Sequence, residues 1–398
     1  MKKHILTLYL ILSLTLTACG VQATTSVAES STANITMTTT TETTSLSQVT
    51  TTQTENTPVS ADFDDDDLTS AMINVSTTIT LDGDSIAVTG EGATMNGSIV
   101  TITAAGVYEI TGTLNNGQIV VVTKDAENVT LLLAGVNIHN ESSSPIYVAN
   151  AEKVIITLAD GTQNSVSDGE NYTNLDENDE PNATIFSHDD LTINGNGALV
   201  VTANYNSGIV SKDDLKITGG NITVTAVNDG IKGKDSVAIN GGVITINAGA
   251  DGIQATNEDK DGKGYIAIEG GTLNITSALD GIQAATSMGI SGGEINITSG
   301  GGAVNTSTNG GGIWGGPGAE GNTNKPEESA IGLKAGLDIN IDGGTLNISS
   351  ADDTVHAGNN ITINGGTLLA ASGDGGHWPR YSLKWPSTRL SSFSALAD

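Results

Sequence analysis

Pairs of adjacent glycines recur along the second half of the chain at a nearly constant interval. They stand at 219/220, 241/242, 270/271, 292/293, 343/344 and 365/366, so successive gaps are 22, 29, 22, 51 and 22 residues. Each of the two long gaps equals one regular spacing plus an insertion, of 7 and 29 residues respectively. A fixed period of this length is typical of a solenoid, in which each coil buries its apolar face against its neighbours.

The residues around each pair alternate between apolar and polar side chains, as in Val237-Ala-Ile-Asn-Gly-Gly-Val-Ile-Thr-Ile246. Alternation of this kind indicates short strands with one buried face, and glycine permits the turn with positive φ between them. No window of helical length has a 3.6-residue apolar period, so we expect little helix. The pattern predicts an all-β parallel β-helix of about 22 residues per coil, with coils about 4.8 Å apart. The spacings of leucine-rich repeats and of glycine-rich calcium repeats are absent.

Composition narrows the set of partners. The 398 residues include 45 acidic and 15 basic side chains, which gives a formal net charge of -30. Nucleic acid and anionic membrane surfaces are excluded as main partners, because binding to phosphate needs clustered Lys and Arg. The charge favours cations or neutral polymers as ligands. Aromatic residues make up 3% of the chain, so aliphatic side chains must build the core.

The single cysteine lies in an N-terminal export signal. Lys2 and Lys3 precede an apolar stretch that is shorter than the roughly 20 residues of a membrane-spanning helix. The stretch ends in Leu16-Thr-Ala-Cys19-Gly, which is similar to a bacterial lipobox. We therefore predict a lipoprotein signal peptide at residues 1–18, lipidation of Cys19, and a protein on the extracellular face of a bacterial membrane that contacts the membrane only through this anchor. An ordinary signal peptide is the alternative.

A stretch rich in Thr and Ser follows the signal peptide. It cannot bury enough apolar surface to offset the entropy of ordering, so residues 19–70 are predicted to form a disordered tether. Aspartates at 62 and 64–67 lie near its end. We interpret this acidic run as a solvated boundary in preference to a cation site.

Alignment of the repeats on their glycine pairs places four aspartates in one column. Asp229, Asp251, Asp280 and Asp353 each stand nine residues after the second glycine of a pair. On adjacent coils, such carboxylates would repel each other by roughly 1 kcal/mol in water and more at lower dielectric. A shared Ca²⁺, with its preference for oxygen ligands, would remove the repulsion. The alternative is a structural turn, because Asp-Gly is favourable turn chemistry.

The two insertions hold further candidates. Asn257, Asp259 and Asp261 occupy alternate positions, as at the start of an EF-hand calcium loop, although the twelfth position is Ile268 and not the bidentate Glu. An exposed polar loop is the alternative there. The longer insertion carries Trp314 in a glycine-rich run, where the indole would stack on a sugar ring or pack on the flank of the solenoid.

Several separated motifs resemble one family. They are Glu180-Pro-Asn-Ala-Thr-Ile-Phe-Ser187, Asn206-Ser-Gly-Ile-Val-Ser-Lys-Asp-Asp-Leu-Lys-Ile-Thr-Gly-Gly220, Asp229-Gly-Ile-Lys-Gly-Lys-Asp235 and Gly332-Leu-Lys-Ala335. They look like the secreted bacterial carbohydrate-binding β-helix family typified by a clostridial cellulose- and pectin-binding protein. The resemblance implies a right-handed single-stranded parallel β-helix similar to pectate lyases, Ca²⁺ held by the aspartates of the Asp-Gly-Ile turns, and binding to plant cell-wall polysaccharides including polygalacturonate. The resemblance spans about residues 79–377, and we assign residues 73–376 to a carbohydrate-binding β-helix domain.

The residues favour binding over catalysis. A pectate lyase removes a proton with Arg or Lys, and because no arginine precedes Arg380, the base would be Lys232 or Lys334. Asp352-Asp353 is a carboxylate pair suggestive of a hydrolase, but the companion His and Arg motifs are missing. We predict a monomeric, surface-anchored protein that binds pectin or cellulose with Ca²⁺. A calcium-dependent lyase and a purely structural or adhesive solenoid are the alternatives.

Residues 377–398 break the repeat. Both arginines and two of the three tryptophans fall in this stretch, and no further glycine pair follows. We interpret it as a frameshifted tail, with a native end cap as the alternative, since solenoids need caps.

Overall fold

The computed structural model describes residues 59–68, 74–173, 175–176, 178–259, 262–303 and 329–373, together with the backbone of a strand at 393–395. All of them belong to one of the two compact units of the chain, residues 55–398. Cys19, Asp261 and Trp314, the signal peptide, most of the tether and most of the tail lie outside the described residues. No helix in the described ranges has the length and apolar character needed to span a membrane.

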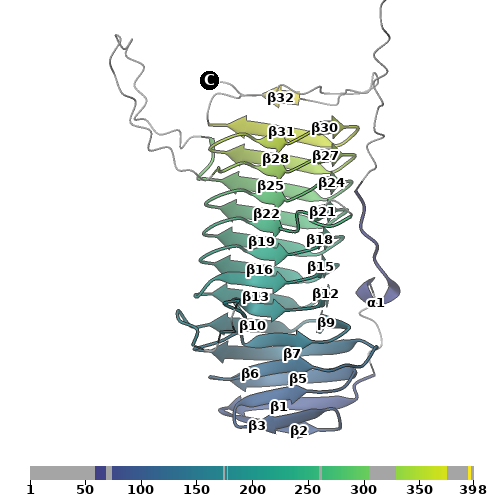
Figure 1. Ribbon diagram of the computed structural model, residues 1–398, viewed down its shortest axis with the longest axis vertical. Helices are drawn as coiled ribbons and strands as arrows, with labels where there is room; N and C mark the ends of the chain where they lie inside the picture. The colour runs from purple at the N-terminus through teal and green to yellow at the C-terminus, as the bar shows by residue number, and fades with distance from the viewer. Residues whose placement is uncertain are drawn as a thin grey trace, which may run out of the picture. The chain divides into compact units, whose positions relative to one another are not determined.

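Stacked parallel strands form the described structure (Figure 1). A typical coil contributes three strands, β14 (Ser207–Ser211), β15 (Asp214–Ile217) and β16 (Asn221–Ala226). Each pairs in parallel with its equivalent in the next coil, so that Ile209 faces Ile231 and Ile222 faces Ile244. The prediction of an all-β protein built of stacked parallel strands is confirmed.

The strands form three stacks. Stack 1 consists of β3 (Ala93–Asn96), β4 (Ile99–Ile102), β6 (Gln118–Val122), β8 (Ile146–Asn150), β11 (Ala183–Ser187), β14, β17 (Ile231–Gly233), β20 (Ile253–Ala255), β23 (Ile282–Ala284), β26 (Leu333–Ala335) and β29 (Val355–Ala357). Stack 2 consists of β9 (Lys153–Leu158), β12 (Asp190–Gly195), β15, β18 (Ser236–Ile239), β21 (Tyr265–Ile268), β24 (Met288–Ile290), β27 (Asp338–Ile341) and β30 (Asn360–Ile363). Stack 3 consists of β10 (Gln163–Asp168), β13 (Ala198–Ala203), β16, β19 (Val243–Ala248), β22 (Thr272–Ser277), β25 (Glu294–Ser299), β28 (Thr345–Ser350), β31 (Thr367–Ser372) and β32 (Phe393–Ala395).

The first coils depart from this plan. β7 (Val129–Asn140) is long enough to pair with both β9 and β10, and it therefore joins stacks 2 and 3 into one sheet. β5 (Gly106–Leu114) pairs with β7, and β1 (Thr77–Gly83) pairs with β5. β2 (Ser85–Thr89) folds back on β1 as an antiparallel hairpin, and β3 and β4 form another. The stacked strands thus begin with two hairpins and continue as regular coils.

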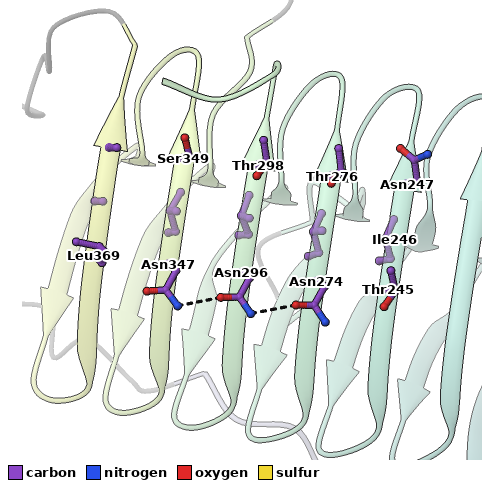
Figure 2. Close-up of a pocket in the computed structure, with 15 residues that line it drawn as sticks. Thr245, Ile246, Asn247, Asn274, Thr276, Asn296, Thr298, Asn347, Ser349 and Leu369 are labelled. Carbon is purple, nitrogen blue, oxygen red and sulfur yellow. Dashed lines mark hydrogen bonds between the residues drawn. The ribbon is translucent and has the colours of Figure 1, made fainter. Parts of the chain in front are cut away.

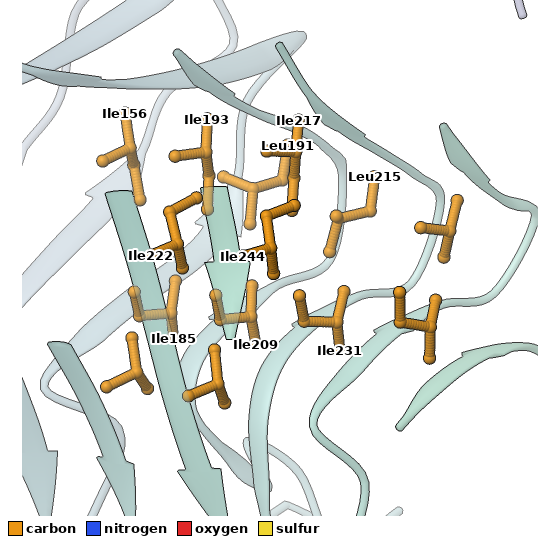
Figure 3. Close-up of a cluster of buried hydrophobic side chains, with 14 of the residues drawn as sticks. Ile156, Ile185, Leu191, Ile193, Ile209, Leu215, Ile217, Ile222, Ile231 and Ile244 are labelled. Atoms are coloured by element: carbon orange, nitrogen blue, oxygen red, sulfur yellow. The ribbon is translucent and has the colours of Figure 1, made fainter. Parts of the chain in front are cut away.

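Aliphatic columns build the core. Ile156, Ile193 and Ile217 occupy one position on consecutive coils of stack 2, and each is fully buried (Figure 3). Ile222 and Ile244 do the same in stack 3. Burying one such side chain contributes about 1.5–3 kcal/mol to stability. The alternation in sequence therefore becomes inward columns of Ile, Leu and Val and outward columns of Thr, Asn and charged residues.

The glycine pairs form the corners before stack 3. The second glycine of all six pairs has φ between 83° and 92°, the left-handed region that favours glycine. At Gly271 a Cβ atom would also lie 3.0 Å from the carbonyl oxygens of Gly241 and Gly242 on the preceding coil. The predicted role of these glycines in the turns is confirmed.

Residues 59–68 lie along the outer face of stack 2 and end in the helix α1 (Asp65–Leu68). Val59 O approaches Gly289 so closely that a Cβ there would be 2.1 Å away, and Ala61 N donates to Glu269 Oε1 at 3.1 Å. Ala238, an outward position of stack 2, is fully buried. This strap therefore covers the outer face of several consecutive coils.

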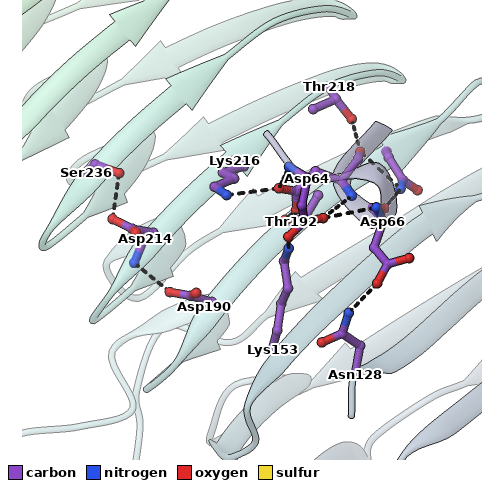
Figure 4. A network of polar contacts seen from close by, with 12 residues as sticks. Asp64, Asp66, Asn128, Lys153, Asp190, Thr192, Asp214, Lys216, Thr218 and Ser236 are labelled. Carbon is purple, nitrogen blue, oxygen red and sulfur yellow. Dashed lines mark hydrogen bonds and ion pairs between the residues drawn. The ribbon is translucent and has the colours of Figure 1, made fainter. Parts of the chain in front are cut away.

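The interpretation of the acidic run as a solvated boundary is wrong for Asp67, whose side chain is fully buried. Its carboxylate lies 2.6 Å from Lys153 Nζ and 2.9 Å from Lys216 Nζ, and it accepts a hydrogen bond from Thr192 at 2.6 Å (Figure 4). Asp64 also pairs with Lys153, at 2.7 Å. Lysines from the outer face of stack 2 therefore neutralise Asp67 and pair with Asp64, whereas Asp62, Asp65 and Asp66 are exposed to solvent.

Candidate functional site

Three of the four predicted column aspartates come together at the turns that precede stack 1. Asp229, Asp251 and Asp280 lie on consecutive coils and are 2–4% exposed. Asp353 is separated from them by one coil, because Ile331 occupies the corresponding position there. The longer insertion lies in the sequence between Asp280 and this coil. An alignment on the glycine pairs therefore does not show that Ile331 occupies the column position there.

One oxygen of each carboxylate binds the backbone of the following coil. Oδ1 of Asp229 accepts from Asp251 N at 3.3 Å, and Oδ1 of Asp251 accepts from Asp280 N at 2.9 Å. Oδ1 of Asp280 accepts from Ile331 N at 2.8 Å. These three contacts link the coils, which is the structural role that we considered beside calcium binding.

The other carboxylate oxygens meet side chains from stack 1. Lys232 Nζ lies 3.1 Å from Asp229 Oδ2, and Lys334 Nζ lies 2.8 Å from Asp280 Oδ2. The two candidate catalytic lysines thus each neutralise one column aspartate. They stand in one outward column of stack 1, on either side of Gln254 and its neighbour Gln283.

No lysine among the described residues forms an ion pair with the middle carboxylate, Asp251. Asp251 Oδ2 accepts from Gln254 Nε2 at 2.7 Å. Burial, followed by the nearby charges of Asp280 and Asp229, raises the pKa of Asp251 to about 7. Gln254 Oε1 is buried and has no hydrogen-bond partner among the described residues. An acidic group short of positive charge beside an unpartnered oxygen is a donor set that suits a hard cation such as Ca²⁺.

The shorter insertion folds back on Asp235. Asn257 Nδ2 donates to Asp235 Oδ1 at 2.5 Å, and Lys263 forms an ion pair with Asp235. Asn257 Oδ1 accepts from the backbone N of Asp259, whose side chain is exposed. The structure therefore shows a loop held by an amide and a lysine, and with Asp261 outside the described residues the EF-hand-like site stays a prediction.

A second acidic cluster was missed by the sequence analysis. Carboxylate oxygens of Asp190, Asp213 and Asp214 lie within 4.8 Å of one another (Figure 4 shows Asp190 and Asp214). Burial raises the pKa of Asp213 to about 7, with further contributions from Asp235, Asp190 and Asp214. A signal was present, since Asp190 and Asp214 directly precede Leu191 and Leu215, which are paired residues on adjacent coils of stack 2. It was overlooked because the alignment was centred on the glycine pairs.

A polar pocket of about 360 Å³ lies over the turns around stack 1. Three lysines line it, Lys212, Lys232 and Lys234. The other polar lining residues are Asn182, Asn206, Ser207, Ser211, Asn228 and Thr256. Lys212 and Lys234 directly follow paired strands on adjacent coils, so the solenoid repeat itself brings their ammonium groups to one place. None of the described lining residues has a carboxylate, which is unusual for a chain with a net charge of -30.

The pocket lysines differ in their partners. Lys212 forms an ion pair with Glu180, and Lys232 pairs with Asp229 at 3.1 Å. Within the described ranges no carboxylate pairs with Lys234, and its side chain is exposed. The pocket can therefore offer at least one uncompensated positive charge, together with amide and hydroxyl groups, to a ligand.

Comparison with known proteins gives the family. A family model described as "Carbohydrate-binding domain-containing protein" matches residues 96–376. The chain belongs to this family. A curated carbohydrate-binding domain-containing protein of Acetivibrio thermocellus is 50% identical over 156 residues, which are 38% of this chain and 54% of that protein. The chain thus spans about half the length of the curated relative that it matches.

A solved structure is also similar to this carbohydrate-binding domain. It is that of the polysaccharide lyase-like protein from C. thermocellum, determined as a gadolinium derivative. The two chains are 46% identical with a TM-score of 0.56, and the match covers 57% of this chain and 92% of the other. The aspartate column, the acidic cluster and the lysine pocket all lie within the part of the chain that the family model matches.

Proposed function

We propose that this protein binds acidic plant cell-wall polysaccharide, such as the polygalacturonate of pectin, with uronate carboxylates in the lysine pocket. The observation that carries the proposal is the convergence of Lys212, Lys232 and Lys234 in a pocket without carboxylates on an otherwise acidic protein. Membership of a carbohydrate-binding family supports a sugar polymer as the ligand.

The chemistry of the pocket matches that of a uronate chain. Exposed Lys234 would pair with one carboxylate, and hydrogen bonds of this charge-assisted kind are the strong ones. Asn206 and Asn228 belong to adjacent coils, since Asn228 N donates to Asn206 O at 3.1 Å. Their amides can donate to and accept from sugar hydroxyls. Charge provides affinity, and the amides provide recognition of the sugar.

Calcium is part of the proposal. Ca²⁺ near Asp251 would neutralise the charge that the lysines of the column leave uncompensated, and Gln254 Oε1 would become a ligand. Asp190, Asp213 and Asp214 form a second candidate position. The similar solved protein was obtained as a gadolinium derivative, and gadolinium, like Ca²⁺, is a hard cation that prefers oxygen ligands. Calcium bound at these sites would reduce the repulsion between the acidic protein and a polyuronate.

Further details belong to the same proposal. We expect right-handed winding with about 22 residues per coil, a monomeric protein, and display on the cell surface through Cys19 and the tether of residues 19–70. Trp314 would add a stacking surface for sugar rings, since an aromatic face packs well against apolar surfaces.

The test compares variants of the full chain for binding to polygalacturonate by calorimetry. Lys212→Ala combined with Lys234→Ala should weaken binding about tenfold or more, which corresponds to roughly 1.4 kcal/mol. Lys124→Ala removes an exposed lysine elsewhere and should leave affinity unchanged. Equal affinity of the double variant and the wild type would show that the lysine pocket does not bind polygalacturonate.

A lyase remains the second candidate, because the solved neighbour is described as polysaccharide lyase-like. Lys232 or Lys334 would be the base. Incubation with polygalacturonate and Ca²⁺ should then raise ultraviolet absorbance from unsaturated product, and Lys232→Ala or Lys334→Ala should abolish the rise. A flat absorbance trace with bound polymer supports the binding function alone.

A further inference from the structure

We propose that a groove on the outer face of stack 3 binds a neutral polysaccharide chain laid along the stacking direction of the coils. The inference rests on the proposed carbohydrate-binding function. It concerns another face of the solenoid and another ligand chemistry than the lysine pocket.

The groove has a volume of about 560 Å³ and crosses the strands β19, β22, β25, β28 and β31. Two rows of outward side chains line it (Figure 2). One row contains Thr245, Asn274, Asn296 and Asn347, which are paired residues on consecutive coils. The other row contains Asn247, Thr276, Thr298 and Ser349, two residues further along the same strands. Every coil from β19 to β28 therefore presents the same two polar positions.

The described residues that line the groove are all uncharged. None of them is Asp, Glu, Lys or Arg, although the chain carries 60 such side chains. An acidic polymer would find no cation here, and the surrounding protein is negative. A ligand whose polar groups are hydroxyls and ether oxygens meets amides and hydroxyls instead. Charge complementarity thus favours a neutral glycan in this groove, whereas an acidic uronate chain would bind in the lysine pocket.

The asparagine row is held in a fixed orientation. Asn296 Nδ2 donates to Asn274 Oδ1 at 3.0 Å, and Asn347 Nδ2 donates to Asn296 Oδ1 at 2.8 Å. An amide has two N–H groups and an oxygen with two lone pairs, so Asn296 keeps one N–H and one lone pair for a ligand. Because the ladder orients these groups in advance, a ligand pays little entropy to order them.

The spacing of the rows sets the direction of the ligand. Neighbouring strands lie about 4.8 Å apart, so the groups repeat along the stack and not along the strand. A polymer parallel to the stack would meet one amide and one hydroxyl position per coil. Affinity should therefore increase with the number of sugar units until the four coils with polar rows, β19 to β28, are covered. The fifth lining strand, β31, has Leu369 and Ala371 at these two positions.

The test measures the affinity of the full chain for soluble β-1,4-linked gluco-oligosaccharides of two to eight units by calorimetry. Affinity should rise with length and level off near four units, because four coils present the polar rows. Thr276→Glu combined with Thr298→Glu places charge and bulk in the groove and should weaken binding at least tenfold. Thr225→Glu changes the corresponding row on β16, outside the groove lining, and should change affinity by less than a factor of two. Far-ultraviolet circular dichroism verifies that each variant is folded.

Polygalacturonate separates failure of this inference from failure of the proposed function. The groove variant should bind polygalacturonate like the wild type, and the Lys212/Lys234 variant should bind the neutral oligosaccharides like the wild type. Wild-type binding to polygalacturonate without binding to neutral oligosaccharides, or an unaffected groove variant, would overturn the groove and leave the lysine pocket. In either case the asparagine row would be a structural ladder only. Absence of binding to both polymers would overturn both proposals.

Discussion

At the scale of single residues, several buried carboxylates form ion pairs with lysines. Asp67 is enclosed by Lys153 and Lys216, and Asp229 and Asp280 each have one lysine. Removing one member of a buried ion pair leaves the other charge unpaired, which costs more than the pair gains from its attraction. The main effect of these ion pairs is therefore to fix the position of the strap on stack 2 and the register of neighbouring coils.

The strap gives the first prediction. Asp67→Asn should lower the free energy of unfolding by about 3 kcal/mol, because two lysines lose their buried counter-charge. Asp65→Asn changes an exposed residue of the same helix and should have an effect within about 0.5 kcal/mol. Urea denaturation followed by fluorescence measures both.

The pH dependence of the same variant is a further check. Contacts with Lys153, Thr192 and Lys216 outweigh burial and hold the pKa of Asp67 below its ordinary value. Its contribution is therefore present above the unfolded pKa of about 3.9 and is lost as the pH falls through the folded value. Wild type and Asp67→Asn should become equally stable in strong acid. A constant difference at all pH values would show that the carboxylate charge is not responsible.

Asp251 gives a prediction of opposite sign. Its pKa of about 7 lies above the unfolded value, so the folded state binds the extra proton between about pH 4 and 7. The contribution of Asp251 to the free energy of unfolding therefore falls as the pH rises from about 4 to 7. In EDTA, Asp251→Asn should therefore be more stable than the wild type at pH 8 by on the order of 1 kcal/mol. Asp82→Asn, at an exposed position, is the control. A variant less stable than the wild type at pH 8 would contradict the assignment.

Adding Ca²⁺ should make the wild type more stable than Asp251→Asn at pH 8. If Ca²⁺ binds at the middle of the aspartate column, adding it at pH 8 stabilises the wild type by mass action and leaves Asp251→Asn nearly unchanged. Thermal melts with and without millimolar Ca²⁺ test this. Equal stabilisation of both proteins would place the ion elsewhere, and the Asp190–Asp213–Asp214 cluster would then be the next position to mutate.

At the scale of elements, the coil is defined by local patterning. The alternation around Ile222 and Ile244 and the glycine pairs were enough to predict parallel strands, buried columns and the corners. Contacts between distant residues could not be predicted in this way. Nothing in the local sequence links Asp67 to Lys216, and the insertion hid the position of Ile331 between Asp280 and Asp353. The lining of the lysine pocket comes from four consecutive coils, so it becomes visible only when these coils are stacked in space.

The corner glycines give the prediction at this scale. Gly271→Ala should lower stability by more than the roughly 1–2 kcal/mol of a left-handed backbone alone, because its Cβ would also lie 3.0 Å from the carbonyl oxygens of the preceding coil. Gly262→Ala has a similar φ of 80° with no atom within 4 Å, so it should show the backbone cost alone. Urea midpoints compare the two. Equal losses would show that close stacking at the corner is not a constraint.

At the scale of the whole molecule, charge is divided among faces. The chain carries a net charge of -30, yet one pocket presents three lysines and one groove has no charged lining residue. Salt screens interactions between exposed charges with a Debye length of about 10 Å at 0.1 M. Binding of polygalacturonate should therefore weaken several-fold between 50 and 500 mM salt, whereas binding of a neutral glycan should change little. Similar salt dependence for both ligands would contradict two separate sites.

The most direct test of the central claim is the migration of the full-length protein in native gels that contain dissolved polysaccharide. We predict that polygalacturonate with Ca²⁺ retards the wild-type protein, and that the Lys212→Ala/Lys234→Ala variant is retarded much less. Unchanged migration of the wild-type protein in polygalacturonate, pectin and soluble cellulose derivatives, with or without Ca²⁺, would contradict the assignment of a polysaccharide-binding function.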